Sequence, residues 1–183
     1  MGTGQTYGDD IPLREEGVGP EEQLPRDEGP HLYKIRGKYY LICAESSTSL
    51  AHSEVAYKAD SVFGPYKRWP CSLMLTFSPS AGDAAGILIF KNEAQQYFFC
   101  MTADGIALRR INKRGFDTLA QAPLSPSASI GLKAVCRGLV YDFYYQPSNS
   151  DWQLLASDVD VRHVSSSVGG FTGTTIGLYA EHE

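Results

Sequence analysis

The sequence lacks the features that mark several large protein classes. It contains no run of about 18 consecutive apolar residues, so no segment is long enough to span a membrane as a helix. Its four cysteines include no Cys-x-x-Cys pair, which excludes the usual spacing of zinc and thioredoxin-like sites. Two of them, Cys43 and Cys100, stand in apolar runs and are expected to be buried small hydrophobic residues. Amphipathic helices of about ten or more residues are also missing, so little helix is expected.

Positive charge is sparse as well. The 183 residues carry 16 Lys and Arg against 21 Asp and Glu, which gives a net charge of −5. Residues 1–30 contain eight acids and two bases, so the acidic balance is set almost entirely at this end. No basic patch is present, which excludes a nucleic-acid interface. Residues 5–27 also contain three prolines and little apolar periodicity, so we expect a loop there.

The beginning of the chain lacks a targeting signal. Met1 is followed by Gly-Thr-Gly-Gln-Thr, without the basic and then apolar segments of a signal peptide. As written, the sequence therefore predicts a cytoplasmic protein, and a secreted one if its true N-terminus lies further upstream.

Short apolar runs bounded by turn residues recur from residue 28 onward, and they predict strands. Arg36-Gly37, Asp104-Gly105 and Arg137-Gly138 are the expected turns between neighbouring runs. The pattern is typical of an all-β sandwich or barrel. The runs are 31–35, 38–44, 52–57, 73–77, 86–90, 96–102, 106–111, 132–135, 139–145, 152–155 and 174–179.

Two ordered sets of motifs resemble glycoside hydrolase family 43. Glu28-Gly29-Pro30-His31, followed by Gly37-Lys38-Tyr39-Tyr40-Leu41, resembles the strand pair of the family's propeller that carries the general acid, and Gly64-Pro65-Tyr66 resembles the turn after the family's next strand. Tyr141-Asp142-Phe143 and Gly169-Gly170-Phe171-Thr172-Gly173 resemble the β-sandwich that follows the propeller in its β-xylosidases. The resemblance implies an antiparallel sheet from a partial propeller blade, followed by a jelly-roll, concanavalin A-like sandwich.

The same resemblance divides the chain into three segments. Residues 1–27 are expected to form an acidic loop rich in proline and glycine. Residues 28–70 correspond to the partial propeller segment, and residues 71–183 to the C-terminal sandwich. The family folds a five-bladed propeller before its sandwich, whereas here the chain runs from Tyr66 almost directly into sandwich-like sequence. The later blades, and the aspartate that serves as the family's catalytic base, have no counterpart.

Three residues match functional positions of the family. Glu28 matches the general acid. By the composition of residues 1–30 alone, it would simply be the last charged residue of an acidic loop. His52 matches a histidine that helps to hold an ion or water near the propeller axis, or is an ordinary strand residue. Phe171 matches an aromatic residue that a sandwich loop can direct toward the sugar, or packs inside the sandwich. The family can hold a calcium ion near His52, but the residues themselves indicate no cofactor or metal.

Other polar and aromatic residues have simpler interpretations. Asp158 and Asp160 are expected to be turn acids. Trp152 and the pair Tyr144-Tyr145 could stack on sugar rings, but the alternation of side chains along a strand favours core packing.

The resemblance implies a glycosidase that hydrolyses O-glycosyl bonds of xylan- or arabinan-type hemicellulose. It would be an inverting β-xylosidase or α-L-arabinofuranosidase, and its partner a pentose-containing oligosaccharide or polysaccharide. Because the base and most of the propeller are missing, the chain by itself is expected to be inactive. The alternative is a non-catalytic carbohydrate-binding or interaction sandwich, or a fragment from a mis-joined gene. The sequence does not indicate an oligomeric state.

Overall fold

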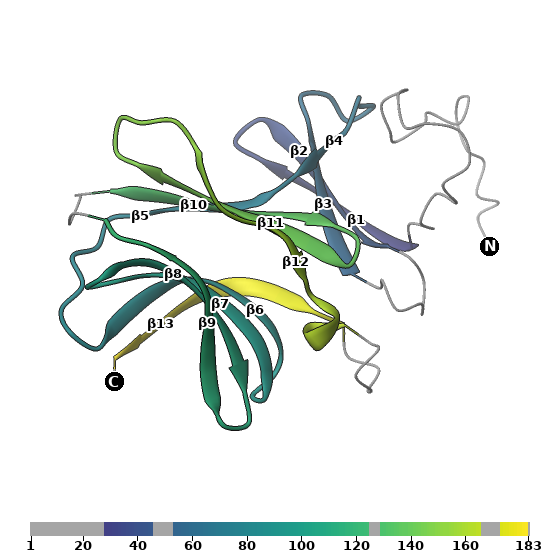
Figure 1. Cartoon of the computed structure of the whole chain (residues 1–183). Helices are drawn as coiled ribbons and strands as arrows, with labels where there is room; N and C mark the ends of the chain where they lie inside the picture. The colour runs from purple at the N-terminus through teal and green to yellow at the C-terminus, as the bar shows by residue number, and fades with distance from the viewer. Residues whose placement is uncertain (1–27, 46–52, 125–128, 166–172, 183) are drawn as a thin grey trace.

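The computed structural model describes residues 28–45, 53–124, 129–165 and 173–182. In these residues the chain forms three antiparallel sheets and a single turn of 3₁₀-helix, η1 (Arg162–Val164) (Figure 1). The predicted all-β class is confirmed. Two of the sheets stack as a sandwich, and the third lies beside them.

Sheet A contains the first four strands in the order β1-β2-β3-β4. The turn between the first two is Arg36-Gly37, where both residues have positive φ, 49° and 79°. This pair of angles belongs to the two-residue hairpin turn that matches strand twist, so the predicted hairpin is confirmed. The strands are β1 (Glu28–Ile35), β2 (Lys38–Glu45), β3 (Ser53–Ala59) and β4 (Lys67–Trp69).

One face of sheet A is buried. Its members alternate along β2 and β3, because successive side chains of a strand point to opposite faces. Tyr66, from the Gly-Pro-Tyr motif, joins them, and its hydroxyl donates a hydrogen bond to the Val62 carbonyl at 3.0 Å. The buried residues are Leu41, Cys43, Val55, Tyr57, Ala59 and Tyr66.

The sandwich consists of a four-stranded sheet B and a five-stranded sheet C. The chain crosses between them three times, after β5, after β9 and after β12. Sheet B has the order β12-β11-β10-β5, with β5 (Cys71–Leu75), β10 (Ile130–Arg137), β11 (Val140–Pro147) and β12 (Gln153–Asp160). Sheet C has the order β13-β6-β7-β8-β9, with β6 (Asp83–Asn92), β7 (Gln95–Thr102), β8 (Gly105–Asn112), β9 (Gly115–Ala122) and β13 (Thr175–His182).

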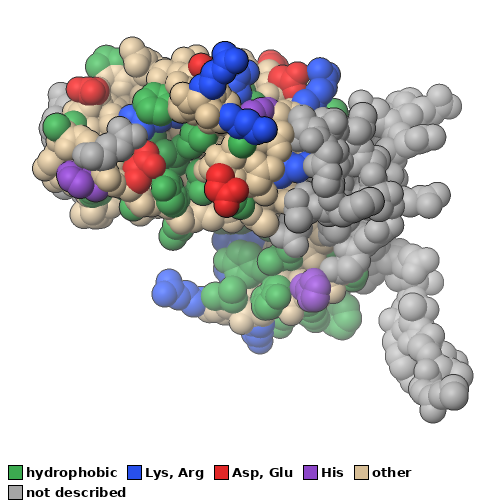
Figure 2. Space-filling model, turned by 90° about the horizontal axis from the view of Figure 1, so that it is seen from below, with side chains coloured by type: hydrophobic (Ala, Val, Ile, Leu, Met, Phe, Trp, Pro, Cys, Tyr) green, Lys and Arg blue, Asp and Glu red, His purple; other side chains and the backbone are tan. Residues whose placement is uncertain are grey.

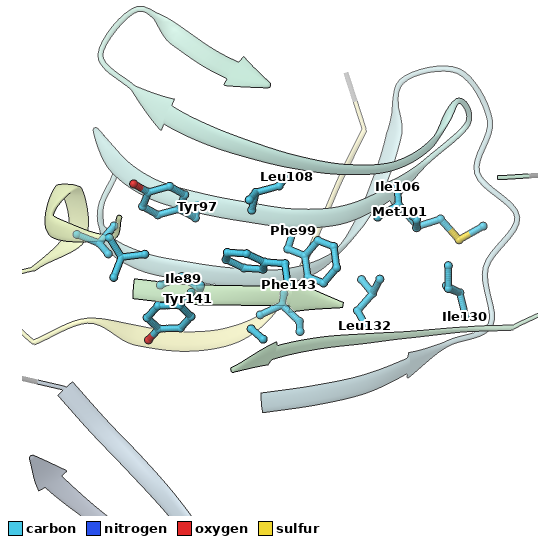
Figure 3. Close-up of a cluster of buried hydrophobic side chains, with 14 residues drawn as sticks. Ile89, Tyr97, Phe99, Met101, Ile106, Leu108, Ile130, Leu132, Tyr141 and Phe143 are labelled. Carbon is cyan, nitrogen blue, oxygen red and sulfur yellow. The ribbon is translucent and has the colours of Figure 1, made fainter. Parts of the chain in front are cut away.

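The core of the sandwich lies between these two sheets (Figure 3). At its centre Phe99 of β7 meets Phe143 of β11 edge to face, with ring centroids 5.3 Å apart. Tyr141 stacks on Phe143 at 6.1 Å. The predicted burial of Cys43 and Cys100 is confirmed, since both thiols are almost completely covered.

The outer face of sheet C is also partly apolar. Phe98 and Cys100 point away from the core but are fully buried, together with Ala84 and Ala107. Figure 2 views this side of the molecule and shows hydrophobic side chains in a hollow flanked by charged ones. The sheet is therefore concave on its outer side.

Three details differ from expectation. β4 and β9 were not predicted, because β4 has three exposed residues and β9 is mostly exposed and polar. The β7–β8 turn is Ala103-Asp104, and Gly105 already belongs to β8. A Cβ on Gly105 would lie 2.3 Å from the Ala122 carbonyl oxygen, so this glycine permits a close approach of strands. The turn after β10 is Gly138-Leu139, one residue later than predicted.

The two sheets of the sandwich end unevenly. Leu178 of β13 is directly opposite Ile87 of β6, so both side chains point to the inner side of sheet C. Ile87 is fully buried, whereas Leu178 is 79% exposed. The short β5 is the edge strand of sheet B, and β13 is the edge strand of sheet C.

Candidate functional site

The predicted acid, Glu28, is the first residue of β1. Its backbone pairs with Ala44 of β2, and the register shifts between Glu28 and His31 before regular pairing resumes. Such bulges bend a strand and redirect side chains, and they are frequent next to active sites. The Glu28 side chain itself lies outside the described part of the structure.

The register of sheet A also fixes where the neighbouring segment enters. Ala44 pairs with Glu28 on one side and with Glu54 on the other, so these backbone positions form one row across the sheet. The chain that leads into Ser53 therefore reaches the sheet at the end where β1 begins. His52 precedes Ser53 and lies outside the described residues.

Phe171 also lies outside the described residues, but both ends of the segment that carries it are described. Buried Lys91 of β6 donates a hydrogen bond through Nζ to the Ser165 carbonyl at 2.6 Å. The Thr174 hydroxyl donates to the Val164 carbonyl at 2.7 Å. Burial lowers the pKa of Lys91. Sequence reasoning missed this lysine, which links Ser165, the last described residue before 166–172, to β6.

The most buried carboxylate in the described residues belongs to Asp142. It accepts hydrogen bonds from Nε and Nη2 of Arg137, at 3.0 and 2.8 Å, and from the Asp158 backbone N–H at 2.9 Å. Hydrogen bonds from Arg137 are the main reason why the pKa of Asp142 is below its usual value. These hydrogen bonds connect the Asp142 carboxylate to Arg137 of β10 and to Asp158 of β12. Because its oxygens are occupied in this way, Asp142 does not fit the role of the missing catalytic base.

Asp158 and Asp160 were expected in a turn, but both belong to strand β12, whose pairing with β11 is irregular around Asp158, and both form ion pairs. Asp158 has a positive φ of 52° and contacts Arg137 at 2.8 Å. Asp160 contacts Arg162 at 3.0 Å. Within the described ranges, no three His, Cys, Asp or Glu side chains come together as a metal site. No described helix is long and apolar enough to cross a membrane.

The aromatic residues of sheet B divide between its two faces. Tyr145 packs against the sandwich core, as expected. Tyr144 and Trp152 instead lie on the outer face, on either side of Lys133. The Lys133 ammonium is 4.5 Å from the Tyr144 ring centroid and 4.3 Å from that of Trp152. Core packing is therefore confirmed for Tyr145 and wrong for Trp152, which is 37% exposed.

A pocket of about 470 Å³ lies where β4 continues into β5, between sheet A and the sandwich. Arg68, Trp69 and Lys133 contribute to its lining, along with apolar side chains from β2 and β3. Sequence reasoning missed this site, because residues 67–70 belonged to no predicted strand and Lys133 is far away in the sequence.

Comparison with known proteins fits this architecture. The model of the β-xylosidase C-terminal concanavalin A-like domain matches residues 67–183, which cover sheets B and C completely. The chain belongs to this family. The model of glycosyl hydrolases family 43 matches residues 4–88, so both parts of the predicted resemblance are confirmed.

Individual relatives of the family match shorter stretches. The non-reducing end α-L-arabinofuranosidase BoGH43B of Bacteroides ovatus is 43% identical over 49 residues, 27% of this chain and 9% of that protein. The xylosidase/arabinosidase 43B of Humicola insolens is 43% identical over 65 residues, 32% of this chain and 12% of that protein. The chain spans less than a fifth of the curated relatives that it matches.

A solved relative supports the fold. The crystal structure of xylan β-1,4-xylosidase from Bacillus halodurans C-125 superposes with a TM-score of 0.55 at 14% identity. The match covers 96% of this chain and 63% of that structure. The concanavalin A-like domain is therefore joined here to a family 43 segment in the arrangement that the sequence predicted.

Proposed function

We propose that this chain derives from a glycoside hydrolase acting on O-glycosyl bonds of xylan- or arabinan-type hemicellulose, with Glu28 as its general acid. The observation that carries the proposal is the order of the two family matches, a family 43 segment followed by the sandwich of β-xylosidases. Relatives named as arabinofuranosidase and xylosidase/arabinosidase support the substrate class. Residues 28–70 are then the propeller-derived segment and residues 71–183 the sandwich.

The chemistry of an inverting glycosidase explains what each residue would do. An acid protonates the leaving oxygen while a base activates water on the other side of the sugar ring, with the carboxyls about 6.5–9.5 Å apart. Glu28 would supply the proton. His52 and Phe171 would line the sugar site, the first from the propeller side and the second from the sandwich.

We further propose that the chain is inactive alone. None of its carboxylates matches the base, and general acid–base assistance contributes about 10²- to 10⁴-fold per group. Loss of the base would therefore leave little rate even with a correctly placed acid.

A second candidate is a non-catalytic carbohydrate-binding or interaction module. The closed core of the sandwich favours it, because sheets B and C bury their facing side chains without help from sheet A.

Sequencing the DNA on both sides of the reading frame would test the third possibility, a fragment of a longer gene. Encoded propeller blades next to the frame would support it.

Hydrolysis of aryl β-xyloside and aryl α-L-arabinofuranoside by the purified chain tests the main proposal. We expect no turnover above buffer for the chain or for Glu28→Gln. Turnover that disappears in Glu28→Gln would overturn the inactivity but support the assignment of Glu28. Turnover that survives this substitution would contradict the role of Glu28. If neighbouring DNA encodes the missing blades, the same pair of variants in the restored protein tests the acid directly.

A further inference from the structure

The outer face of sheet C has the shape and composition of a ligand site. It is concave, and Figure 2 shows hydrophobic side chains in the hollow. The pairing register places Leu88 of β6, Phe98 of β7 and Ile111 of β8 on this face. Phe98 is fully buried, and the other two pack against its cluster and are partly buried. Ligand sites are typically concave and mostly apolar, with a few polar groups that orient the ligand.

Exposed aromatic rings stand at both sides of this apolar floor. Tyr179 of β13 is 41% exposed at one edge of the sheet, and Phe116 of β9 is 46% exposed at the other. Tyr179 is opposite Gly86 and Phe116 is opposite Ile111, so both side chains belong to the outer face. Strands spaced by about 4.8 Å put the two edges of the five-stranded sheet about 19 Å apart along the sheet. This width suits an extended ligand.

Both rings are held in place by side chains of the same face. The Tyr179 ring packs edge to face on Phe98, with centroids 5.1 Å apart. The Arg109 guanidinium lies 4.4 Å from the Phe116 centroid, and it pairs with the Glu181 carboxylate at 3.4 Å. The positions of the rings are therefore largely fixed before a ligand arrives, which lowers the entropy lost on binding.

The outer face carries no excess charge. Among the described residues that the register assigns to this face, Arg109 and Glu181 are charged, and they neutralise each other. Thr118 and Gln121 of β9 add exposed, uncharged polar groups beside Phe116, which can both donate and accept hydrogen bonds. An ionic ligand would find no counter-charge here. The composition favours a neutral ligand that has apolar faces and hydroxyl groups.

Gly177 of β13 keeps the floor accessible from the β13 side. It is directly opposite Leu88, and a Cβ built on it would meet no atom within 4 Å. Its φ is not positive, so other residues fit the backbone at this position. A larger side chain at residue 177 would extend over the floor without disturbing the core.

We propose that the outer face of sheet C binds a neutral oligosaccharide chain of pentose units. The apolar faces of the sugar rings pack on Tyr179 and Phe116, and the sugar hydroxyls bond to polar side chains such as Thr118. A chain of linked rings can follow the curved face from one edge to the other. The pentose chemistry rests on the proposed function, and the site gives the carbohydrate-binding candidate a location separate from Glu28 in sheet A.

Isothermal titration of the full chain tests the proposal. The probes are xylohexaose, xylobiose and arabinohexaose. We expect a hexaose to bind about tenfold or more tightly than xylobiose, because only the longer chain reaches both aromatic rings. The affinity should change little when salt is raised, since the face and the ligand carry no net charge.

Three substitutions locate the binding site. Tyr179→Ala and Phe116→Ala each remove one ring and should weaken hexaose binding about tenfold. Gly177→Gln removes no contact but covers the floor, and should weaken binding by a similar factor. The matched control is Tyr33→Ala, which truncates a tyrosine of β1 that is 48% exposed and should bind like the original chain. Thermal unfolding of each variant checks that it is folded.

No heat with either hexaose at millimolar concentration would overturn the proposal and favour a protein partner on this face. Equal affinity for xylobiose and xylohexaose would contradict an extended site. Hexaose binding that survives Gly177→Gln in a folded protein would place the saccharide elsewhere and also overturn it. The titration measures binding without bond cleavage, whereas Glu28 is tested by hydrolysis, so failure of one proposal is distinguishable from failure of the other.

Discussion

The guanidinium of Arg109 on β8 lies 3.4 Å from the carboxylate of Glu181 on β13, although β6 and β7 separate these two strands in sheet C. Side chains three strands apart can meet only because the outer face of the sheet is concave, as Figure 2 shows. Both side chains are largely covered, with 18% and 24% of their surfaces exposed. Arg109 also lies over the Phe116 ring, 4.4 Å from its centroid.

Arg109→Ala should therefore destabilise the sandwich. The substitution removes the packing on Phe116 and leaves the Glu181 carboxylate half-buried without its partner, so we expect a loss of about 1–3 kcal/mol. Urea unfolding followed by tryptophan fluorescence measures it. Arg114→Ala, in the exposed turn after β8, is the control and should change stability by less than about 0.5 kcal/mol. Equal effects of the two variants would contradict the structural role of the pair.

The four thiols should differ strongly in reactivity. Burial raises the pKa of Cys100 to about 12, so at pH 8 only about one molecule in ten thousand carries its thiolate. Burial also raises the pKa of Cys71, whereas Cys136 is half-exposed. We expect iodoacetamide to label Cys136 first and Cys100 only in denaturant. Peptide mass spectrometry reads the order, and rapid labelling of Cys100 in the native protein would show that the core is open.

Acid should weaken the protein partly through Asp142. Its pKa is lower in the folded protein than in the unfolded chain, because Arg137 hydrogen-bonds to the charged form. The stabilisation is complete above the ordinary carboxyl pKa, and it is lost as the pH falls through the lowered value. Asp142→Asn should cost about 1–3 kcal/mol at neutral pH and flatten the decline that begins near pH 4 when the pH is lowered from about 7 to about 2. Unfolding midpoints measured across this range give both quantities.

Lys91→Met tests the attachment of the segment that carries Phe171. The substitution keeps an apolar side chain of similar length but leaves the Ser165 carbonyl without this donor. We expect faster amide exchange at Ser165 and at residues 173–174, and a stability loss of about 1–3 kcal/mol. Unchanged exchange at both ends of the segment would show that Lys91 does not hold it. Lys113→Met, at an exposed lysine in the turn between β8 and β9, is the surface control.

Local patterns in the sequence predicted most of the sandwich. Arg36-Gly37 was identified because both turn residues tolerate positive φ, and β6 because its apolar run is long enough to be buried on both faces. β9 was not predicted, because a mostly exposed, polar strand contains no continuous apolar run. The turns near Gly105 and Gly138 lie one residue away from their predicted positions. A glycine marks the neighbourhood of a turn, but the turn can include the residue before it or the residue after it.

The sites follow a different rule. Glu28, His52 and Phe171 came from family motifs, and the catalytic roles of all three stay predictions. The pocket could not be predicted, because Trp69 and Lys133 are 64 residues apart and meet only through the pairing of β5 with β10. Single-sequence patterns report on near neighbours, whereas this site depends on long-range pairing.

The exposed Leu178 side chain affects how the protein behaves in concentrated solution. β13 has eight residues, contains no proline, and pairs on only one side among the described residues. An edge strand of this kind can form backbone hydrogen bonds with an extended chain that approaches it. The exposed Leu178 side chain adds an apolar contact. Among the described edge strands, β13 therefore combines open backbone pairing with an exposed leucine, and we expect self-association at high protein concentration to begin there.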